Sequence, residues 1–335
     1  MKLVMAGLDH RSADIGVREQ FALTGEKTGR ALASIKERYN AGGCVIISTC
    51  NRTELYASVP DGFGFSPALA LCEALGEDYA AFSNCFSERA GERAIERLCR
   101  VASGLDSQIT GDDQIITQTR EAVELARTAQ CTDSYTETVF RLAIQAAKSI
   151  KTNVILKTVG SASIPDKTVK VINRIYPLAG RDAVVIGNGQ TGRLVAELLI
   201  REGVNVTVTV REYKKGAVYI PERAAAVMYG ERYGAVERAD IVVSATKSPH
   251  FTLRSDVLRT LPKRPDVIVD LAVPRDVEPS ACEIPGIRLL TIDDISDDGR
   301  ALPPESNALI DAIIEAHIEK YNRWKNGGWK MEDGG

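Results

Sequence analysis

Asp182-Ala-Val-Val-Ile-Gly-Asn-Gly-Gln-Thr-Gly192 decides the fold of the second half of this chain. Its apolar start predicts a strand over 182–187, a helical pattern follows over 191–202, and a second strand-like run covers 204–210. The glycines fit the spacing G-x-G-x-x-G in the strand–turn–helix setting that a dinucleotide-binding loop requires. A purely structural turn is the alternative. The residues expected to bind the dinucleotide are Gly187, Asn188, Gly189, Gln190, Thr191 and Gly192.

Further strand-like runs over 240–245, 266–271 and 288–292 alternate with helical segments. This alternation predicts a doubly wound parallel sheet of the Rossmann type. The turn Ser244-Ala245-Thr246 either lies beside the cofactor or simply ends its strand. An amphipathic pattern over 305–324 predicts a final helix, and a polar tail follows it.

The end of the strand at 204–210 bears on the type of cofactor. Arg211 stands where an arginine accommodates a 2′-phosphate, and Lys214 and Lys215 lie just beyond it. These cations favour NADP(H). Glu212 keeps NAD open, because an acidic residue at such a strand end binds the ribose hydroxyls.

The first half mixes the two patterns. Strand-like runs cover 2–7, 44–48 and 53–59, and helical spacing covers 26–39, 90–102 and 137–151. A small α+β domain with helices on one face of its sheet fits this order. We therefore expect an α/β multidomain protein: an N-terminal α+β catalytic domain over 1–155, a Rossmann-type NADP-binding domain over 156–300, and a C-terminal helix and tail over 301–335.

Composition narrows the setting. The 335 residues suggest about two domains, and no apolar run is long enough to span a bilayer. The N-terminus has no signal-peptide pattern, and the seven cysteines include no Cys-x-x-Cys pair, so we expect reduced thiols in the cytoplasm and neither disulfides nor a metal site. The net charge of −3 means that an RNA partner would need a local basic patch.

Residues 43–54 carry the most informative chemistry of the first half. An apolar strand-like run ends in Ser48-Thr-Cys-Asn-Arg-Thr-Glu54, which presents Cys50 at a strand terminus. A nearby guanidinium lowers the pKa of a thiol, and Arg52 is two residues away. The alternative is a small buried hydrophobe, as most free cysteines are.

This segment closely resembles the nucleophile motif of the glutamyl-tRNA reductases, and the resemblance covers nearly the whole chain. Residues 7–13, Gly-Leu-Asp-His-Arg-Ser-Ala, look like the opening of that family. Residues 100–107 and 111–118 are similar to its later motifs in the catalytic domain. Residues 270–279, Asp-Leu-Ala-Val-Pro-Arg-Asp-Val-Glu-Pro, match a motif of its nucleotide domain almost letter for letter.

The resemblance implies that a Cys50 thiolate attacks the ester between glutamate and tRNA(Glu), and that NADPH then reduces the thioester to glutamate-1-semialdehyde. This is the first step of five-carbon tetrapyrrole synthesis. The implied partners are glutamyl-tRNA as substrate and the aminotransferase that consumes the semialdehyde. The implied substrate-binding residues are Thr49, Asn51, Arg52, Ser107, Asp112, Asp113, Gln114 and Gln118.

The sequence also departs from the family pattern. Arg97 stands where the family usually has a histidine, and we expect it to act as a catalytic cation that favours the thiolate, since arginine cannot be a general base. Asp112 replaces a glutamate. The chain ends soon after 305–324, where family members continue into a dimerising helical domain, so the oligomeric state stays open. His10 matches the opening motif but is more often a structural residue. A reductase of another acyl donor and a non-catalytic relative remain alternatives.

Overall fold

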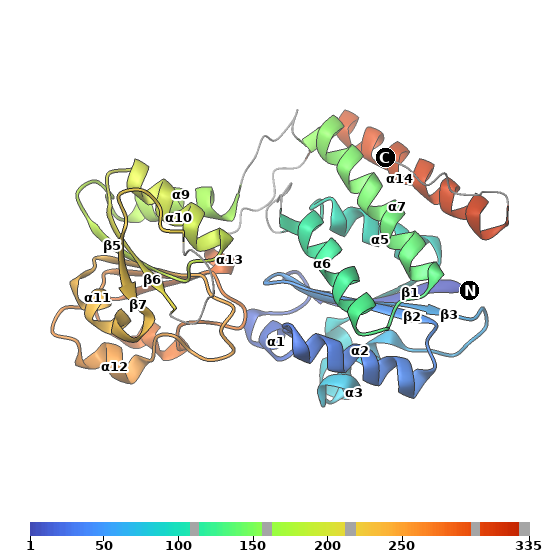
Figure 1. Cartoon of the computed structure of the whole chain (residues 1–335), viewed down its shortest axis with the longest axis horizontal. Coiled ribbons are helices and arrows are strands. Elements are labelled where there is room, and N and C mark those ends of the chain that lie inside the picture. The colour runs from blue at the N-terminus through green and yellow to red at the C-terminus, as the bar shows by residue number, and fades with distance from the viewer. Residues whose placement is uncertain (108–113, 156–162, 212–218, 296–301, 328–335) are drawn as a thin grey trace. The chain divides into compact units, whose positions relative to one another are not determined.

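The computed structural model (Figure 1) describes residues 1–107, 114–155, 163–211, 219–295 and 302–327. Contacts divide the chain into two compact units. The first unit comprises residues 1–162 and 298–335, and the second comprises residues 163–297. No helix of the described part is long and apolar enough to cross a membrane.

The first unit is built on a four-stranded antiparallel sheet in the order β2-β3-β1-β4. The expected strands are present as β1 (Lys2–Asp9), β2 (Gly43–Ser48) and β3 (Arg52–Val59). The short edge strand β4 (Ser87–Ala90) is an addition that the apolar pattern did not predict.

Helices cover both faces of this sheet, so the expectation of one covered face is wrong. Every residue of β3 is buried, which requires cover on both sides. Figure 1 shows α1, α2 and α3 below the sheet and α5, α6, α7 and α14 above it. Their bounds, with the short α4, are α1 Ile15–Gln20, α2 Glu26–Tyr39, α3 Pro67–Leu75, α4 Tyr79–Phe82, α5 Glu92–Ala102, α6 Gln114–Thr128, α7 Ser134–Ile150 and α14 Pro304–Lys325.

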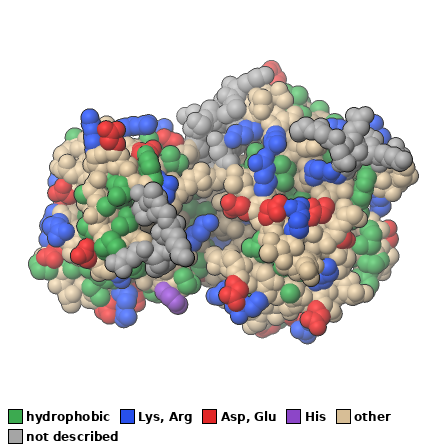
Figure 2. Space-filling model, viewed as in Figure 1, with side chains coloured by type: hydrophobic (Ala, Val, Ile, Leu, Met, Phe, Trp, Pro, Cys, Tyr) green, Lys and Arg blue, Asp and Glu red, His purple; other side chains and the backbone are tan. Residues whose placement is uncertain are grey.

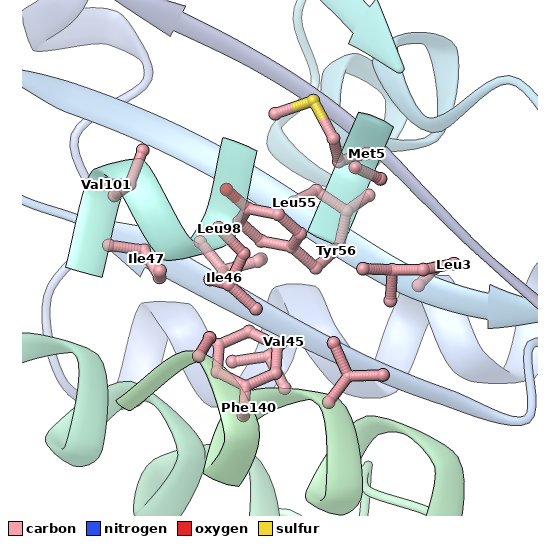
Figure 3. Packing of buried hydrophobic residues seen from close by; sticks show 14 of the residues in the cluster. Leu3, Met5, Val45, Ile46, Ile47, Leu55, Tyr56, Leu98, Val101 and Phe140 are labelled. Atoms are coloured by element: carbon pink, nitrogen blue, oxygen red, sulfur yellow. The ribbon is translucent and has the colours of Figure 1, made fainter. Parts of the chain in front are cut away.

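The core of the first unit lies on both faces of the sheet, and Figure 3 shows part of it. Phe140 of α7 and Tyr56 of β3 are fully buried and meet edge to face, with ring centroids 5.6 Å apart. Val45 of β2, which pairs with Tyr56 in the sheet, and Leu98 of α5 belong to the same cluster. This packing fixes α5 and α7 against the strands that lead into the Cys50 turn.

The expected C-terminal helix is present as α14 and belongs to the first unit. Tyr321 of α14 hydrogen-bonds Tyr135 of α7 through their hydroxyls. The Asn322 amide donates to Glu92 of α5 over 2.8 Å. Segments at the two ends of the chain therefore share one core.

The second unit contains a six-stranded, all-parallel sheet in the order β10-β9-β8-β5-β6-β7, with the order reversing at β5 as in a dinucleotide-binding fold. The strands alternate with helices, as expected, and β7 is an edge strand that the sequence did not reveal. The bounds are β5 Asp182–Ile186, β6 Asn205–Val210, β7 Ala225–Met228, β8 Ile241–Ser244, β9 Val267–Asp270, β10 Arg288–Thr291, α9 Ile164–Ile175, α10 Gln190–Arg201, α11 Arg232–Arg238, α12 Ser255–Thr260 and α13 Ile292–Ile295.

We predict that Phe140→Ala lowers the free energy of unfolding of the first unit by about 3–5 kcal/mol, because it removes a fully buried ring and leaves a cavity. Urea unfolding measures the change. Gln145→Ala, at an exposed position of the same helix, is the control and should stay within about 0.5 kcal/mol of the parent. Equal effects of the two substitutions would contradict this packing.

Candidate active site

Cys50 lies in the tight connection between β2 and β3, at the strand end where the sequence predicts it, and is half-buried. Hydrogen bonds within the connection and one from α1 fix its backbone. The Thr49 amide donates to the Arg52 carbonyl over 2.9 Å, and the Asn51 amide donates to the Thr49 hydroxyl over 3.2 Å. The Arg18 guanidinium of α1 donates to the Cys50 carbonyl over 2.8 Å. The backbone that carries the thiol is therefore fixed on a rigid scaffold.

Arg97 of α5 lies inside a buried cluster of carboxylates. Its guanidinium donates to Asp9 over 2.9 Å, to Glu54 over 2.6 Å and to Asp106 over 2.8 Å. Burial disfavours its charge, but Glu54 and Asp106 outweigh burial and raise the pKa of Arg97. The expected cation is thus present, but its described contacts are with these carboxylates.

The carboxylate of Asp9 is held ionised by the same cluster. Burial alone would raise the pKa of Asp9, but hydrogen bonds from Arg11 and Arg97 prevail and lower it. Tyr56 also belongs to this cluster, because its hydroxyl donates to Glu54 over 2.5 Å. The cluster joins the end of β1, the start of β3 and the turn after α5.

Arg52 is also buried, with 1% of its surface exposed. Its guanidinium donates to Glu54 over 3.1 Å and to the Asp106 carbonyl, and only Nε is left without a partner. Two of the five N–H groups of Arg52 are thus bound to protein partners, and Nε is the nitrogen that has none.

Among the buried polar atoms without a hydrogen-bond partner in the described residues, three belong to adjoining residues near Cys50. They are Nδ1 of His10, Oδ1 of Asn51 and Nε of Arg52. Their residues adjoin one another: Asp9 pairs with Arg52 across β1 and β3, and the His10 amide donates to the Asn51 carbonyl over 3.0 Å. Unpaired buried polar atoms are costly, so three together mark a place for a polar ligand.

The imidazole of His10 is neutral in this setting. Burial, with the nearby Arg52, lowers its pKa to about 4 despite the opposing charge of Asp9. A neutral ring can accept a hydrogen bond at Nδ1 when its proton is on Nε2. A histidine that the sequence leaves as more often structural is thereby brought into the site.

The other predicted substrate residues are only partly placed. Ser107 follows Asp106 directly, and Gln114 and Gln118 lie one turn apart at the start of α6. Asp112 and Asp113 lie outside the described residues. The residues that sequence reasoning missed are Asp9, Glu54 and Asp106, which pair with Arg97, and Arg18, which holds the Cys50 carbonyl. The signal that could have found them is the number of charged residues within otherwise apolar elements.

The glycine loop of the second unit has the geometry that its spacing predicts. Gly187 has a φ of 106°, and a Cβ there would come within 2.5 Å of the Ala245 carbonyl oxygen. A Cβ on Gly192 would lie 1.9 Å from the Gly187 carbonyl oxygen, whereas one on Gly189 would meet nothing within 4 Å. Gly189 precedes α10 and faces open space, which leaves room for a pyrophosphate at the helix N-terminus. The residues present fit a dinucleotide.

Arg211 lies at the end of β6, and its guanidinium stacks on the Tyr229 ring 4.8 Å from the centroid. Glu212, Lys214 and Lys215 lie outside the described residues. The turn after β8 lies beside the glycine loop, since the Ala245 amide donates to the Ile186 carbonyl over 2.8 Å.

Two buried aspartates stand at the same edge of the sheet. Asp276 accepts hydrogen bonds from Ser244 and from the amide and hydroxyl of Thr246. Burial and the neighbouring Asp276 raise the pKa of Asp270 to about 8. These contacts anchor the turn Ser244-Ala245-Thr246 after β8. A structural role therefore accounts for the polar residues of this turn without a ligand.

A presented thiol on one unit and a dinucleotide-binding fold on the other define an oxidoreductase. Residues 6–154 match the family model "Glutamyl-tRNAGlu reductase, N-terminal domain", and residues 170–297 match "Shikimate / quinate 5-dehydrogenase". The chain is 39% identical to glutamyl-tRNA reductases from Alkaliphilus oremlandii and Acetivibrio thermocellus, over 97% of this chain and 97% of each relative. It is similar, at 28% identity and a TM-score of 0.49, to the structure of the glutamyl-tRNA reductase from Methanopyrus kandleri, covering 96% of this chain and 79% of that one.

The chain belongs to the glutamyl-tRNA reductase family. The family and the nucleotide fold together imply a nicotinamide cofactor.

We predict that the two loop glycines fail differently. Gly192→Ala should lower the melting temperature of the free protein, because its Cβ collides with backbone. Gly189→Ala should leave that temperature unchanged but weaken nucleotide binding at least about tenfold, because its Cβ fills the space of the pyrophosphate. Thermal unfolding and fluorescence titration with NADPH measure both effects. Normal nucleotide binding by Gly189→Ala would contradict the assignment of the loop.

A second prediction concerns His10. Its imidazole should titrate near pH 4 instead of the ordinary 6.5, and its contribution to stability should fall as the pH drops between these values, because there the unfolded chain binds the extra proton. Side-chain NMR of the three histidines over a range of pH measures this directly. A His10 pKa near 6.5 would place the ring in solvent and contradict the buried site.

Proposed function

We propose that this protein reduces glutamyl-tRNA(Glu) to glutamate-1-semialdehyde with NADPH through a thioester on Cys50. The observation that carries the proposal is the combination of a half-buried thiol on a fixed turn with three adjoining unpartnered polar atoms. A thiol alone would suit many reactions. Unpartnered donors and acceptors beside it favour a substrate with both an anionic and a cationic group, as in a glutamyl residue.

The polar atoms divide by sign between the two groups of the substrate. Arg52 Nε can donate to the side-chain carboxylate of the glutamyl group. Oδ1 of Asn51 and Nδ1 of neutral His10 can accept from its ammonium group. Thr49, Ser107, Gln114 and Gln118 would bind the remainder, as the resemblance implies, and Asp112 and Asp113 stay predictions on the same ground.

The reaction needs one nucleophile and one hydride. The Cys50 thiolate attacks the ester carbonyl carbon, a C–S bond forms, and the C–O bond to the terminal ribose breaks, so that tRNA leaves as an alkoxide that takes a proton from water. Gly187–Gly192 would hold NADPH, which would supply the hydride for reduction of the thioester carbon. The C–S bond then breaks, Cys50 regains its thiolate, and the aldehyde is released.

In this proposal Arg97 acts as a positioning residue. Its guanidinium is surrounded by Asp9, Glu54 and Asp106, so much of its field is cancelled before it reaches Cys50. Arg97 instead fixes the positions of Glu54 and Asp106, and these two residues accept hydrogen bonds from Arg52. Arg52 is the guanidinium nearest in sequence to Cys50 and is the better candidate to favour the thiolate.

The cofactor and the cellular setting follow from other observations. The residues Gly187–Gly192 would hold the pyrophosphate, and Arg211 at the end of β6 supports NADPH over NADH, because its guanidinium can bind a 2′-phosphate. All seven cysteines are free thiols, which supports a cytoplasmic location. The aminotransferase that consumes the semialdehyde is the expected functional partner.

The test is turnover of glutamyl-tRNA with NADPH. We expect formation of the semialdehyde by the parent protein, and loss of roughly 10³-fold or more in Cys50→Ser, since the hydroxyl is a far weaker nucleophile at this site. Cys85→Ser, at another half-buried cysteine of the first unit, is the matched control and should retain activity.

The outcomes separate the alternatives. Full activity of Cys50→Ser would remove the covalent mechanism. Inactivity on glutamyl-tRNA together with reduction of another aminoacyl-tRNA or carrier-bound acyl group would replace the substrate. Binding of tRNA and nucleotide without any reduction would favour a regulatory relative.

A further inference from the structure

We propose that a cationic pocket on the first unit binds backbone phosphates of the tRNA. The pocket has a volume of about 260 Å³ and is lined by Ile116, Thr117, Arg120, Lys148, Lys151 and Thr152. The inference rests on the proposed function, because the tRNA part of the substrate supplies the phosphates. It adds a place where the nucleic acid is held apart from the glutamyl group.

The lining of this pocket carries an excess of positive charge. It contains three cations, two threonine hydroxyls and no carboxylate. No ion pair or hydrogen bond of the Arg120 or Lys148 side chain is found among the described residues. On the same two helices, by contrast, Arg127 is neutralised by Glu124 and Glu137. Figure 2 shows Lys and Arg side chains gathered over α6 and α7.

Helix electrostatics explain only part of this cluster. Lys148 and Lys151 lie at the carboxyl end of α7, where the helix dipole favours cations. Arg120 comes from the middle of α6 and has no such reason to be there. Ile116 packs against Ala102 and Ala147 and fixes the two helices, so the three like charges cannot move far apart. A bound polyanion would relieve their repulsion.

The pocket is within reach of the same ligand as the acyl site. Gln114 begins α6, and Arg120 lies six residues further along it, about 9 Å at the rise of an α-helix. One RNA end can therefore present its ester near Gln114 while preceding nucleotides reach Arg120. The net charge of −3 provides no overall attraction for RNA, so a local cationic surface of this kind is required.

The test compares two double variants that remove the same charge. Arg120→Gln/Lys148→Gln empties the pocket of two cations, and Lys27→Gln/Arg30→Gln removes two exposed cations from α2 on the other side of the sheet. Binding of deacylated tRNA(Glu) is measured over a range of salt concentrations, together with the rate of Cys50 alkylation by iodoacetamide. We expect the pocket variant to bind several-fold more weakly and its salt slope to fall by about 2, with alkylation unchanged.

An affinity and salt slope equal to those of the α2 variant would overturn the inference. Binding of inorganic phosphate to the pocket that does not compete with tRNA would also overturn it, because the pocket would then be a small-anion site. Reductase turnover, measured in parallel, separates the two proposals. If the pocket variant turns over glutamyl-tRNA with an unchanged KM, the pocket proposal is wrong and the reductase proposal stands. If tRNA binding depends on the pocket but the parent protein shows no turnover, only the reductase proposal is wrong.

Discussion

The buried ion cluster around Arg97 is the interaction on which the first unit depends most. One guanidinium joins Asp9 at the end of β1, Glu54 in β3 and Asp106 after α5, and each of these segments borders the Cys50 turn. Removing one partner of such a buried set leaves an uncompensated charge and costs about 3–5 kcal/mol. The position of the thiol is therefore coupled to the stability of the domain. The three carboxylates together occupy the guanidinium of Arg97.

Much of the fold could be predicted from local patterns. The runs at 44–48 and 182–186 are apolar because those strands are covered on both faces, and Gly187 marks the turn because its φ of 106° excludes most other residues. The edge strands β4 and β7 escaped prediction. Both are short and largely exposed or half-buried, and pairing with one neighbour stabilises them without an apolar run. The cover on both faces of the first sheet also depends on helices, such as α14, from distant parts of the chain.

The site was predictable to the extent that its chemistry is local. Each of three features, Cys50, Arg52 and the glycine loop, can be recognised from a few residues at a strand end. The cluster that holds them does not, because Asp9, Glu54, Arg97 and Asp106 come from four segments that only the folded chain brings together. Burial changes the expected roles as well. Two nitrogens of Arg52 donate to protein partners. His10 becomes a neutral hydrogen-bond acceptor because burial lowers its pKa.

The central claim is that Cys50 carries the acyl group, and trapping the intermediate tests it most directly. The protein is mixed with glutamyl-tRNA in the absence of nicotinamide, and the peptides are then mapped by mass spectrometry at mildly acidic pH, where thioesters survive. The account predicts one glutamyl group on the peptide that contains Cys50, released as semialdehyde when NADPH is added. Reduction of glutamyl-tRNA without any adduct on Cys50, or with the adduct on another residue, would contradict it.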